Sequence, residues 1–343
     1  MSDHSRRRYE HYEDDVRGRA SARNSRPRSK RRPRHDTAVQ ARVVTVDRGR
    51  YTCLVEADPA GAPGTDVAVT AVRARELHRG GIVVGDRVAL VGDVSGAPGT
   101  LARIVRVEPR LTTLRRTADD TDPVERVIVA NADQLAVVTS ADDPAPNPRL
   151  IDRCLVAAYD GGLVPLLVVT KTDLAPATEL AAQYRALDVP VVVSRRDEDP
   201  AGVRSALHGH RTVLVGSSGV GKSTLVNGLV PDADRAVGGV NPVTGRGRHT
   251  SSSAVALRLP TGGWVIDTPG MRSFGLAHVD PDRVLHAFGD LQDGAAACPR
   301  ACDHLNPSCA LDDWVAAGHA RPDRLASLRR LLAVREADDE PTA

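Results

Sequence analysis

Lysine is scarce among the basic residues of this chain. Only three lysines stand among its 46 basic residues, namely Lys30, Lys171 and Lys222. Arginine carries the rest of the positive charge, so a retained lysine marks a position where a compact ammonium cannot be exchanged for a planar guanidinium. Lys171 and Lys222 therefore mark two candidate functional stretches.

Long apolar runs and cysteines are also scarce. No run approaches the ~18–20 apolar residues that a membrane helix needs, and no apolar segment follows the basic N-terminus as in a signal peptide. These absences argue against a membrane protein and predict a cytoplasmic one. The five cysteines are odd in number, with three between positions 298 and 309. They fit a metal site in a reducing compartment better than a disulfide framework.

The N-terminal third of the chain contains a basic tail and a β-rich unit. Residues 1–36 hold twelve basic against six acidic residues and almost no aliphatic ones, so they cannot fold alone. Such a tail either binds nucleic acid or only keeps the chain soluble. Five short β-like runs follow, at Ala41–Val46, Tyr51–Ala57, Asp66–Val72, Asp86–Val91 and Leu101–Val107.

Five strands in about 70 residues predict a small barrel of the oligonucleotide-binding (OB) type. An SH3-like barrel used for protein contacts is the alternative, because Tyr51 is the only aromatic residue there that could stack on a base. A basic segment closes this unit and suits phosphate contacts. Its arginines are Arg103, Arg106, Arg110, Arg115 and Arg116.

Beyond Pro123 strands and helices alternate, which predicts a parallel sheet with helices on both faces. The expected strands are Leu135–Thr139, Val164–Thr170, Val189–Ser194 and Arg211–Val215, with a hairpin of Val255–Leu259 and Trp264–Asp267. The expected helices are Pro148–Tyr159, Pro176–Leu187, Pro200–His208 and Lys222–Val230, followed after the domain by Leu311–Gly318 and Pro322–Val334.

A glycine loop follows the apolar run Val213–Val215 and reads G-x-x-x-x-G-K-S, the pattern of a phosphate-binding P-loop between a strand and a helix. Its glycines allow backbone N–H groups to turn toward an anion at the helix start. Lys222 would contact phosphate oxygens and Ser223 would bind Mg²⁺. The alternative is an ordinary glycine-rich turn. The candidate residues are Gly216, Ser217, Ser218, Gly219, Val220, Gly221, Lys222, Ser223 and Thr224.

A second motif, Thr170, Lys171, Thr172 and Asp173, ends a predicted strand and resembles the guanine motif N-K-x-D. The Asp173 carboxylate can accept two hydrogen bonds from guanine but not from adenine, so it would select GTP. Thr170 replaces the amide that buttresses the loop, and we expect this to weaken nucleotide binding by about 1 kcal/mol. A surface turn is the alternative for this motif taken alone.

Further along, Asp267 and Gly270 form a D-x-x-G element, whose Asp would hold Mg²⁺ through water. Thr250, with Ser251 as its alternative, stands where the Mg²⁺-binding threonine of a switch segment is expected. Together with Ser194, the motifs occur in the order base motif, Ser194, P-loop, switch and D-x-x-G. In ordinary GTPases the P-loop precedes the base motif, so this order predicts a circular permutation.

Four candidate metal ligands stand within twelve residues near the C-terminus: Cys298, Cys302, His304 and Cys309. Three thiolates and one imidazole are the composition of a closed, structural zinc site. Coincidental thiols are the alternative. Cys53 and Cys154 have no such neighbours and are expected to be small buried side chains.

The barrel, the permuted motifs and the cysteine cluster together resemble the ribosome small subunit-dependent GTPase A (RsgA) family over about residues 38–335. The most telling stretches are Ala130–Gln134, Asp152-Arg153, Gly245–Thr250 and the cysteine cluster. The family's usual ligand spacings are a residue longer in the two outer gaps of that cluster. The resemblance implies a GTP hydrolase that binds the small (30S) ribosomal subunit late in its maturation and leaves on hydrolysis.

The expected fold is therefore an α/β P-loop GTPase domain with permuted motifs between an OB-like barrel and a zinc-binding helical domain. The expected segments are 1–37, a basic tail; 38–110, the barrel; 111–280, the GTPase domain; 281–337, the zinc domain; and 338–343, a tail. Expected partners are GTP and GDP, Mg²⁺ bound with GTP, one zinc ion, and the 30S subunit with its rRNA. We expect a monomer. The alternatives are a P-loop ATPase or kinase, and an RNA-binding protein with a weakly active nucleotide site.

Met271 follows D-x-x-G, where small GTPases commonly place a glutamine that orients the attacking water. Methionine cannot take that role, so slow hydrolysis is expected in isolation. His249 is the nearby side chain that could position or deprotonate water near neutral pH, and it is our candidate catalytic residue. The alternative is catalysis by an rRNA group or by an arginine.

The basic tail yields a prediction about salt. Deleting residues 1–36 should make the dependence of subunit affinity on salt shallower, because each neutralised phosphate contributes roughly −0.7 to −0.9 to the slope of log K against log salt. Binding titrations of the full-length and truncated chains at several salt concentrations measure the two slopes. Identical slopes would show that the tail makes no phosphate contacts.

Overall fold

The computed structural model describes residues 35–55, 66–77, 81–117, 125–185, 187–231, 254–268, 281–300, 302–306 and 309–339. Residues 37–343 form one compact unit. Residues 1–34 of the basic tail, the segment with His249 and Thr250, and Gly270 with Met271 lie outside the described residues. Within the described part, no helix combines the length and apolar composition that crossing a membrane requires.

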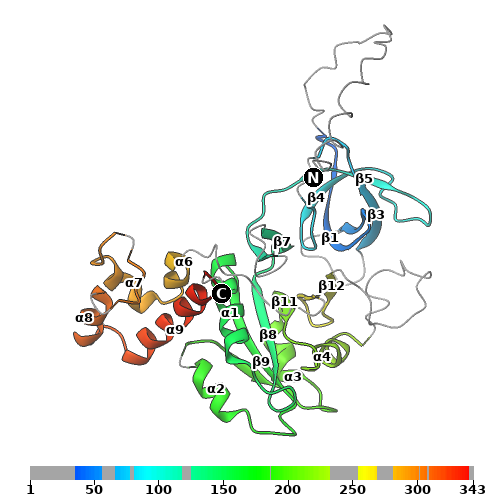
Figure 1. Cartoon of the computed structure of the whole chain (residues 1–343). Helices are drawn as coiled ribbons and strands as arrows, with labels where there is room; N and C mark the ends of the chain where they lie inside the picture. The colour runs from blue at the N-terminus through cyan, green and yellow to red at the C-terminus, as the bar shows by residue number, and fades with distance from the viewer. Residues whose placement is uncertain are drawn as a thin grey trace, which may run out of the picture. The chain divides into compact units, whose positions relative to one another are not determined.

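Five strands near the N-terminus close into a barrel, as predicted (Figure 1). They are β1 (Val39–Asp47), β2 (Arg50–Val55), β3 (Val67–Arg73), β4 (Arg87–Gly92) and β5 (Ala102–Val107). β1 pairs with both β2 and β4, while β5 pairs with both β3 and β4, so the ring has no free edge. Alternate residues such as Val43, Cys53, Val69 and Ile104 point inward and are fully buried.

A two-stranded sheet follows the barrel in the chain, in a stretch for which no strand was predicted. It consists of β6 (Thr113–Thr117) and β7 (Glu125–Ala130). Asn131 follows β7 and ties this segment to the barrel: its side chain accepts from the Leu111 N–H at 2.9 Å and donates to the Gly85 carbonyl at 3.0 Å. The segment that joins the barrel to the parallel sheet is thus a hydrogen-bonded part of the fold.

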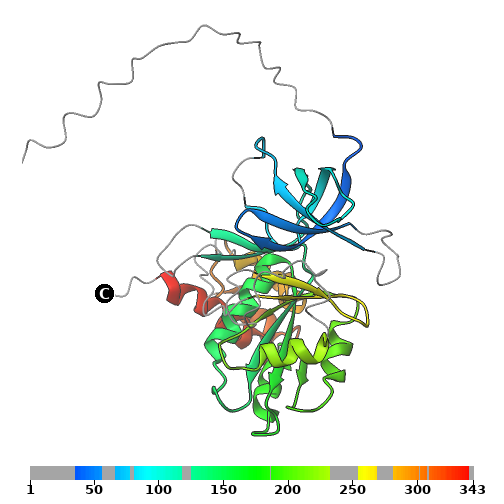
Figure 2. The ribbon, with the colours of Figure 1, turned by 90° about the vertical axis from the view of Figure 1, so that its right-hand side faces the viewer.

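The second domain is built on a parallel sheet, as predicted. Its parallel strands are β8 (Gln134–Ser140), β9 (Val164–Thr170), β10 (Val191–Val193), β11 (Arg211–Val215) and β13 (Trp264–Asp267). They lie in the order β10-β9-β8-β11-β13, and β12 (Val255–Arg258) pairs antiparallel with β13. Figure 2 shows the β12–β13 pair in yellow. β12 also pairs with β1 of the barrel at Val255 and Thr45, so the two sheets are continuous. No pattern in the sequence predicted that junction.

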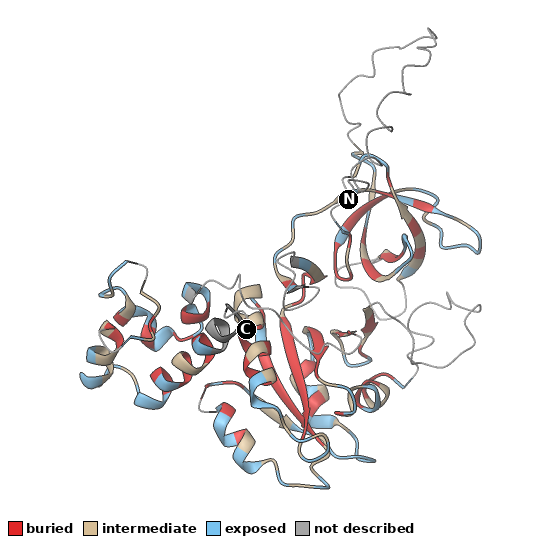
Figure 3. Ribbon diagram, in the orientation of Figure 1, coloured by how far each residue is buried: buried red, intermediate tan, exposed pale blue. Residues whose placement is uncertain are grey.

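Helices cover both faces of this sheet because the strands are apolar on both sides. On β8, Leu135 and Val137 belong to one core with α1 (Pro148–Gly161) and α2 (Thr178–Arg185). The alternate residues Ala136 and Val138 belong to a second core with α3 (Ala201–Leu207) and α4 (Lys222–Leu229). Figure 3 shows the buried strands between helices whose outer faces are exposed.

Four helices follow in the described residues after β13: α6 (Pro281–His286), α7 (Gly289–Ala295), α8 (Ala310–Ala316) and α9 (Pro322–Asp339). The first two were not predicted, because each is shorter than two turns and carries little periodic signal. Their apolar residues join the core that contains α1. Arg330 of α9 pairs with the buried Asp152 of α1, with Nε and Oδ2 3.0 Å apart. This ion pair holds the C-terminal helix on the sheet-covering helix.

Gly85 provides a test of how the barrel is joined to the rest of the fold. Its φ is +90°, and a Cβ there would lie 1.9 Å from the Ala130 carbonyl oxygen. We expect Gly85→Ala to lower the free energy of unfolding by about 3–4 kcal/mol, from backbone strain and displacement of β7. Chemical denaturation measures this value.

Gly49→Ala is the matched control. Gly49 has a φ of +84° but no atom within 4 Å of an added Cβ, so it should lose only the roughly 1–2 kcal/mol of left-handed strain. Equal losses in the two variants would show that contact with Ala130 adds nothing.

Candidate nucleotide site and metal centre

The parallel register brings three predicted motifs to one edge of the sheet. Thr170 ends β9, Gly216 follows β11 and Asp267 ends β13. Leu214 of β11 lies opposite Asp267, and β8 lies between β9 and β11. Carboxyl ends of parallel strands meet at the same edge, which is where doubly wound sheets bind ligands.

The P-loop has the backbone conformation that its glycines predict. Gly216, Gly219 and Gly221 have φ angles of 149°, 81° and 92°. A Cβ on Gly216 would lie 2.2 Å from the Val138 carbonyl oxygen, so the loop passes directly over β8. Gly221 is the N-cap of α4, whose first residue is Lys222. Free N–H groups at this helix start favour an anion.

Two opposite charges share the partly buried floor of this site. Lys222 donates from Nζ to the carbonyl oxygens of Gly216 and Ser217, the latter at 2.8 Å. Burial lowers the pKa of Lys222, and the Asp267 carboxylate acts against that shift. Burial likewise raises the pKa of Asp267, and the Lys222 ammonium lowers it. An ammonium and a carboxylate at the P-loop suit a ligand made of phosphate and a divalent cation.

The base motif is held in a hydrogen-bonded loop beside the P-loop. Lys171 has a φ of 57° and donates from Nζ to the Asp143 carbonyl oxygen. Asp173 accepts from the Arg196 backbone N–H at 3.3 Å, and Thr172 donates from its hydroxyl to the Ser194 carbonyl at 3.3 Å. Ser194 therefore lies next to the base motif.

A surface cleft opens on the Asp173 side of this loop. It is lined in part by Thr172, Asp173, Leu174 and Arg195. Leu174 is 61% exposed, and Arg195 pairs with Glu198 at 3.4 Å. The base motif therefore faces open space on one side and the P-loop on the other.

Thr170, which stands where N-K-x-D has asparagine, contacts the P-loop through its hydroxyl. Its hydroxyl oxygen lies 2.5 Å from the Val220 carbonyl oxygen and 3.0 Å from that of Thr139. The side chain is 6% exposed. The hydroxyl thus lies between the strand under the site and the phosphate loop.

Several predicted residues are not placed. His249, Thr250 and Gly270 lie outside the described residues, and their roles remain predictions. Thr268, the last described residue of D-x-x-G, donates to the Leu214 carbonyl at 2.7 Å and anchors the start of that segment to β11. The Asp143 carbonyl and the Arg196 N–H were missed, because backbone groups leave no signal in the residue types.

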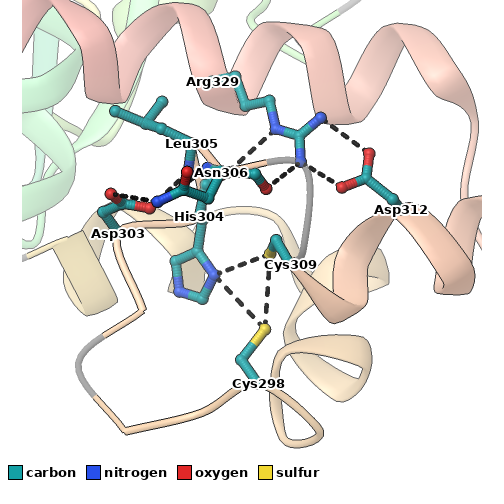
Figure 4. A network of polar contacts seen from close by, with 8 residues as sticks. All are labelled: Cys298, Asp303, His304, Leu305, Asn306, Cys309, Asp312 and Arg329. Carbon is teal, nitrogen blue, oxygen red and sulfur yellow. Dashed lines mark hydrogen bonds and ion pairs between the residues drawn. The ribbon is translucent and has the colours of Figure 1, made fainter.

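Away from this edge, the four predicted metal ligands converge. The ligand atoms of Cys298, Cys302, His304 and Cys309 all lie within 4.8 Å of one another. His304 Nδ1 is 3.7 Å from Cys298 Sγ and 3.5 Å from Cys309 Sγ (Figure 4). A tetrahedral ion with bonds of ~2.0–2.3 Å needs ligand separations of about 3.5–3.8 Å. The donor set and spacing therefore fit a metal ion, despite the shortened loops.

A second layer of contacts orients the His304 loop. Arg329 of α9 donates to the His304 carbonyl at 3.0 Å and forms a two-point ion pair with Asp312 of α8, at 2.9 and 2.7 Å (Figure 4). His304 has a φ of 61°. Burial lowers the pKa of His304, which favours the neutral ring that binds metals, while burial raises the pKa of the Cys309 thiol to about 12. A bound cation would have to stabilise the Cys309 thiolate.

A P-loop, a guanine-type motif and a D-x-x-G aspartate at one sheet edge, with the base motif first in the chain, define a circularly permuted P-loop GTPase. The model of the RsgA GTPase family matches residues 107–277. The "Small ribosomal subunit biogenesis GTPase RsgA" of Alcanivorax borkumensis is 38% identical over 84% of this chain and 82% of its own. That of Pseudomonas syringae pv. tomato is 40% identical over 74% of each. The chain belongs to the RsgA GTPase family.

Two solved structures have the same fold. The circularly permuted GTPase YloQ superposes with a TM-score of 0.63, at 21% identity, over 91% of this chain and 100% of its own. YjeQ from Thermotoga maritima gives a TM-score of 0.61, at 24% identity, over 87% of this chain and 98% of its own. The permuted fold predicted from the motif order is therefore confirmed.

The cysteine cluster predicts a structural metal. We expect one metal ion per purified chain, and we expect Cys302→Ala to release it and unfold about residues 295–335 while nucleotide binding is retained. The reason is that a structural metal contributes roughly 10–16 kcal/mol in small finger peptides, more than a forty-residue core supplies. Elemental analysis and proteolysis of this region measure the two effects.

Cys53→Ala is the control, because Cys53 is buried inside the barrel and has no part in the cluster. Its metal content should equal that of the unmodified chain. Absence of stoichiometric metal from the unmodified chain would contradict the assignment.

Proposed function

We propose that this chain hydrolyses GTP while bound to the small ribosomal subunit and thereby assists late maturation of the subunit. The convergence of the P-loop, Asp267 and Asp173 at one sheet edge is the observation that carries this proposal. Relatives named as small ribosomal subunit biogenesis GTPases support the choice of partner.

The phosphate end of GTP would lie over the P-loop. Backbone N–H groups of residues 217–224 would donate to the β- and γ-phosphates, and Lys222 would exchange its two carbonyl contacts for phosphate oxygens. Ser223 stands in the first turn of α4 and, with Thr250, would bind Mg²⁺. Asp267 would hold Mg²⁺ through water.

The guanine base would lie against the base motif. Asp173 accepts one backbone hydrogen bond and keeps further acceptor capacity for the guanine N1–H and amino group. The aliphatic stem of Lys171, fixed by its contact with Asp143, can lie along the base plane. Adenine offers no matching pair of donors, so Asp173 selects GTP over ATP.

We assign the metal of the cysteine cluster to zinc. Three thiolates and an imidazole are typical of structural zinc and leave no open coordination position for a reaction. The ion would fix the loop between α7 and α8 and so hold the helices α7 to α9 together. Its role is architectural.

The barrel and the basic tail are the parts we assign to rRNA contacts. The barrel presents Arg103 and Arg106 on exposed positions of β5, although Arg106 is paired with Glu108. Phosphate contacts from such arginines would position the chain on the subunit without reading its sequence. We expect a monomer that acts in the cytoplasm, where ribosomal subunits mature.

Titration of GTP turnover with purified small subunits tests the proposal. Turnover should be slow alone and rise with 30S subunits but not with 50S subunits. ATP should not replace GTP.

Asp173→Asn should reduce the preference for GTP and gain use of xanthosine triphosphate, because an amide suits the exocyclic oxygen of xanthine. Equal ATP and GTP affinities, or turnover that no subunit changes, would contradict the proposal.

His249 is the proposed catalytic residue. His249→Ala should lower subunit-stimulated turnover by roughly 100-fold or more, because the loss of a general base slows the chemical step. GTP affinity and subunit binding should be retained. His210→Ala is the matched control: His210 is half-exposed, pairs with Asp133 at 3.0 Å and precedes β11 at the opposite end of the strand from the P-loop. Stimulation that survives His249→Ala would assign catalysis to another group.

A further inference from the structure

Thr170 is the one residue of the base motif that departs from N-K-x-D, and it lies at the junction with the P-loop. We propose that its single hydroxyl proton ties the base motif to the P-loop, so that Thr170 is a positioning residue that sets how fast guanine nucleotide dissociates. The inference rests on the proposed function, because it concerns the same nucleotide site.

The Thr170 hydroxyl has one proton and two neighbouring acceptors. The Thr170 hydroxyl lies 2.5 Å from the Val220 carbonyl oxygen and 3.0 Å from the Thr139 carbonyl oxygen. Both neighbours are acceptors, and a hydroxyl donates only one hydrogen bond at a time. Thr170 can therefore bond to the P-loop or to β8, but not to both. The shorter distance favours the P-loop.

The P-loop acceptor, the Val220 carbonyl, lies within the glycine-rich phosphate cradle. Val220 stands between Gly219 and Gly221, whose positive φ angles shape the phosphate cradle. Its side chain is 3% exposed and belongs to the same buried core as Val138 and Leu225, while its carbonyl oxygen contacts the Thr170 hydroxyl. A Cβ on Gly221 would lie 3.5 Å from the Thr170 hydroxyl, which shows how closely the two loops approach.

Thr170 stands between the residues that would bind the phosphates and those that would bind the base. Lys171 follows Thr170 directly and is fixed on the Asp143 carbonyl, and Asp173 stands two residues further on. Movement of the P-loop away from Thr170 would separate the phosphate cradle from the base-reading side chains. An asparagine amide has two protons and could donate to both carbonyls at once. Threonine therefore gives a looser junction than asparagine and a faster exchange of nucleotide.

The experiment measures dissociation of fluorescent GDP and of a fluorescent, non-hydrolysable GTP analogue from the full-length chain with Mg²⁺ by stopped flow. Thr170→Val removes the proton and should speed dissociation by roughly three- to tenfold, the effect of one lost hydrogen bond. Thr170→Ser keeps the proton and should restore the original rate. Thr170→Asn should slow dissociation by roughly threefold.

Thr212→Val is the matched control. Thr212 is fully buried in β11, and its hydroxyl donates to Gln134 Oε1 at 2.6 Å, two residues into the strand and away from the P-loop. Both Thr212→Val and Thr170→Val should lower the thermal stability of the chain, but Thr212→Val should keep the original dissociation rate. In Thr170→Val the ratio of affinities for GTP and xanthosine triphosphate should not change, because Asp173 remains intact.

The outcomes separate the two proposals. No measurable guanine nucleotide binding by the unmodified chain would overturn the proposed function itself. Tight binding with equal dissociation rates for the unmodified chain and Thr170→Val would overturn only the role of Thr170. Dissociation from Thr170→Asn that is as fast as from the unmodified chain would also overturn it, whether or not the valine variant folds.

Discussion

The parallel pairing around β11 is the constraint on which the rest of this protein depends. β8 and β13 flank β11, and β9 lies beyond β8, all running in one direction. Because parallel strands end at the same edge, three motifs meet there: the base motif at the end of β9, the P-loop after β11 and Asp267 on β13. Nearly one hundred positions separate the first of these motifs from the last. The order of the motifs along the chain can therefore be permuted without altering the site.

The permutation has a consequence for the neighbouring domains. β12, the strand that follows the switch segment, pairs with barrel strand β1, and Arg258 at its end pairs with Asp66 before β3. The segment after D-x-x-G leads into α6, and its helices return to α1 through Arg330 and Asp152. Along the chain, the switch segment thus leads to the strand that pairs with the barrel, and D-x-x-G leads to the metal-bearing helices.

Local patterns were sufficient where a residue type has one dominant use. The strands from β8 to β13 were predicted from apolar runs between turn residues. The start of α1 was predicted at Pro148, and the preceding residue, Asn147, caps this helix by accepting from the Leu150 N–H at 3.2 Å. The metal ligands were predicted from thiols and an imidazole, which rarely gather without a metal. The β6–β7 sheet was missed because Arg115 and Arg116 carry no alternating pattern, and its pairing depends on contacts between distant segments.

The sequence by itself determined the motifs, their permuted order and the chemistry of each side chain, because glycine, lysine, aspartate and cysteine have strong and specific preferences. Only the tertiary structure decided how these groups meet. It placed the Thr170 hydroxyl against the Val220 carbonyl, Asp173 beside the Arg196 N–H, and Arg329 behind His304. Each of these contacts uses a backbone group, which every residue carries. The residue types therefore leave them unspecified, and only the folded path of the chain selects the partner.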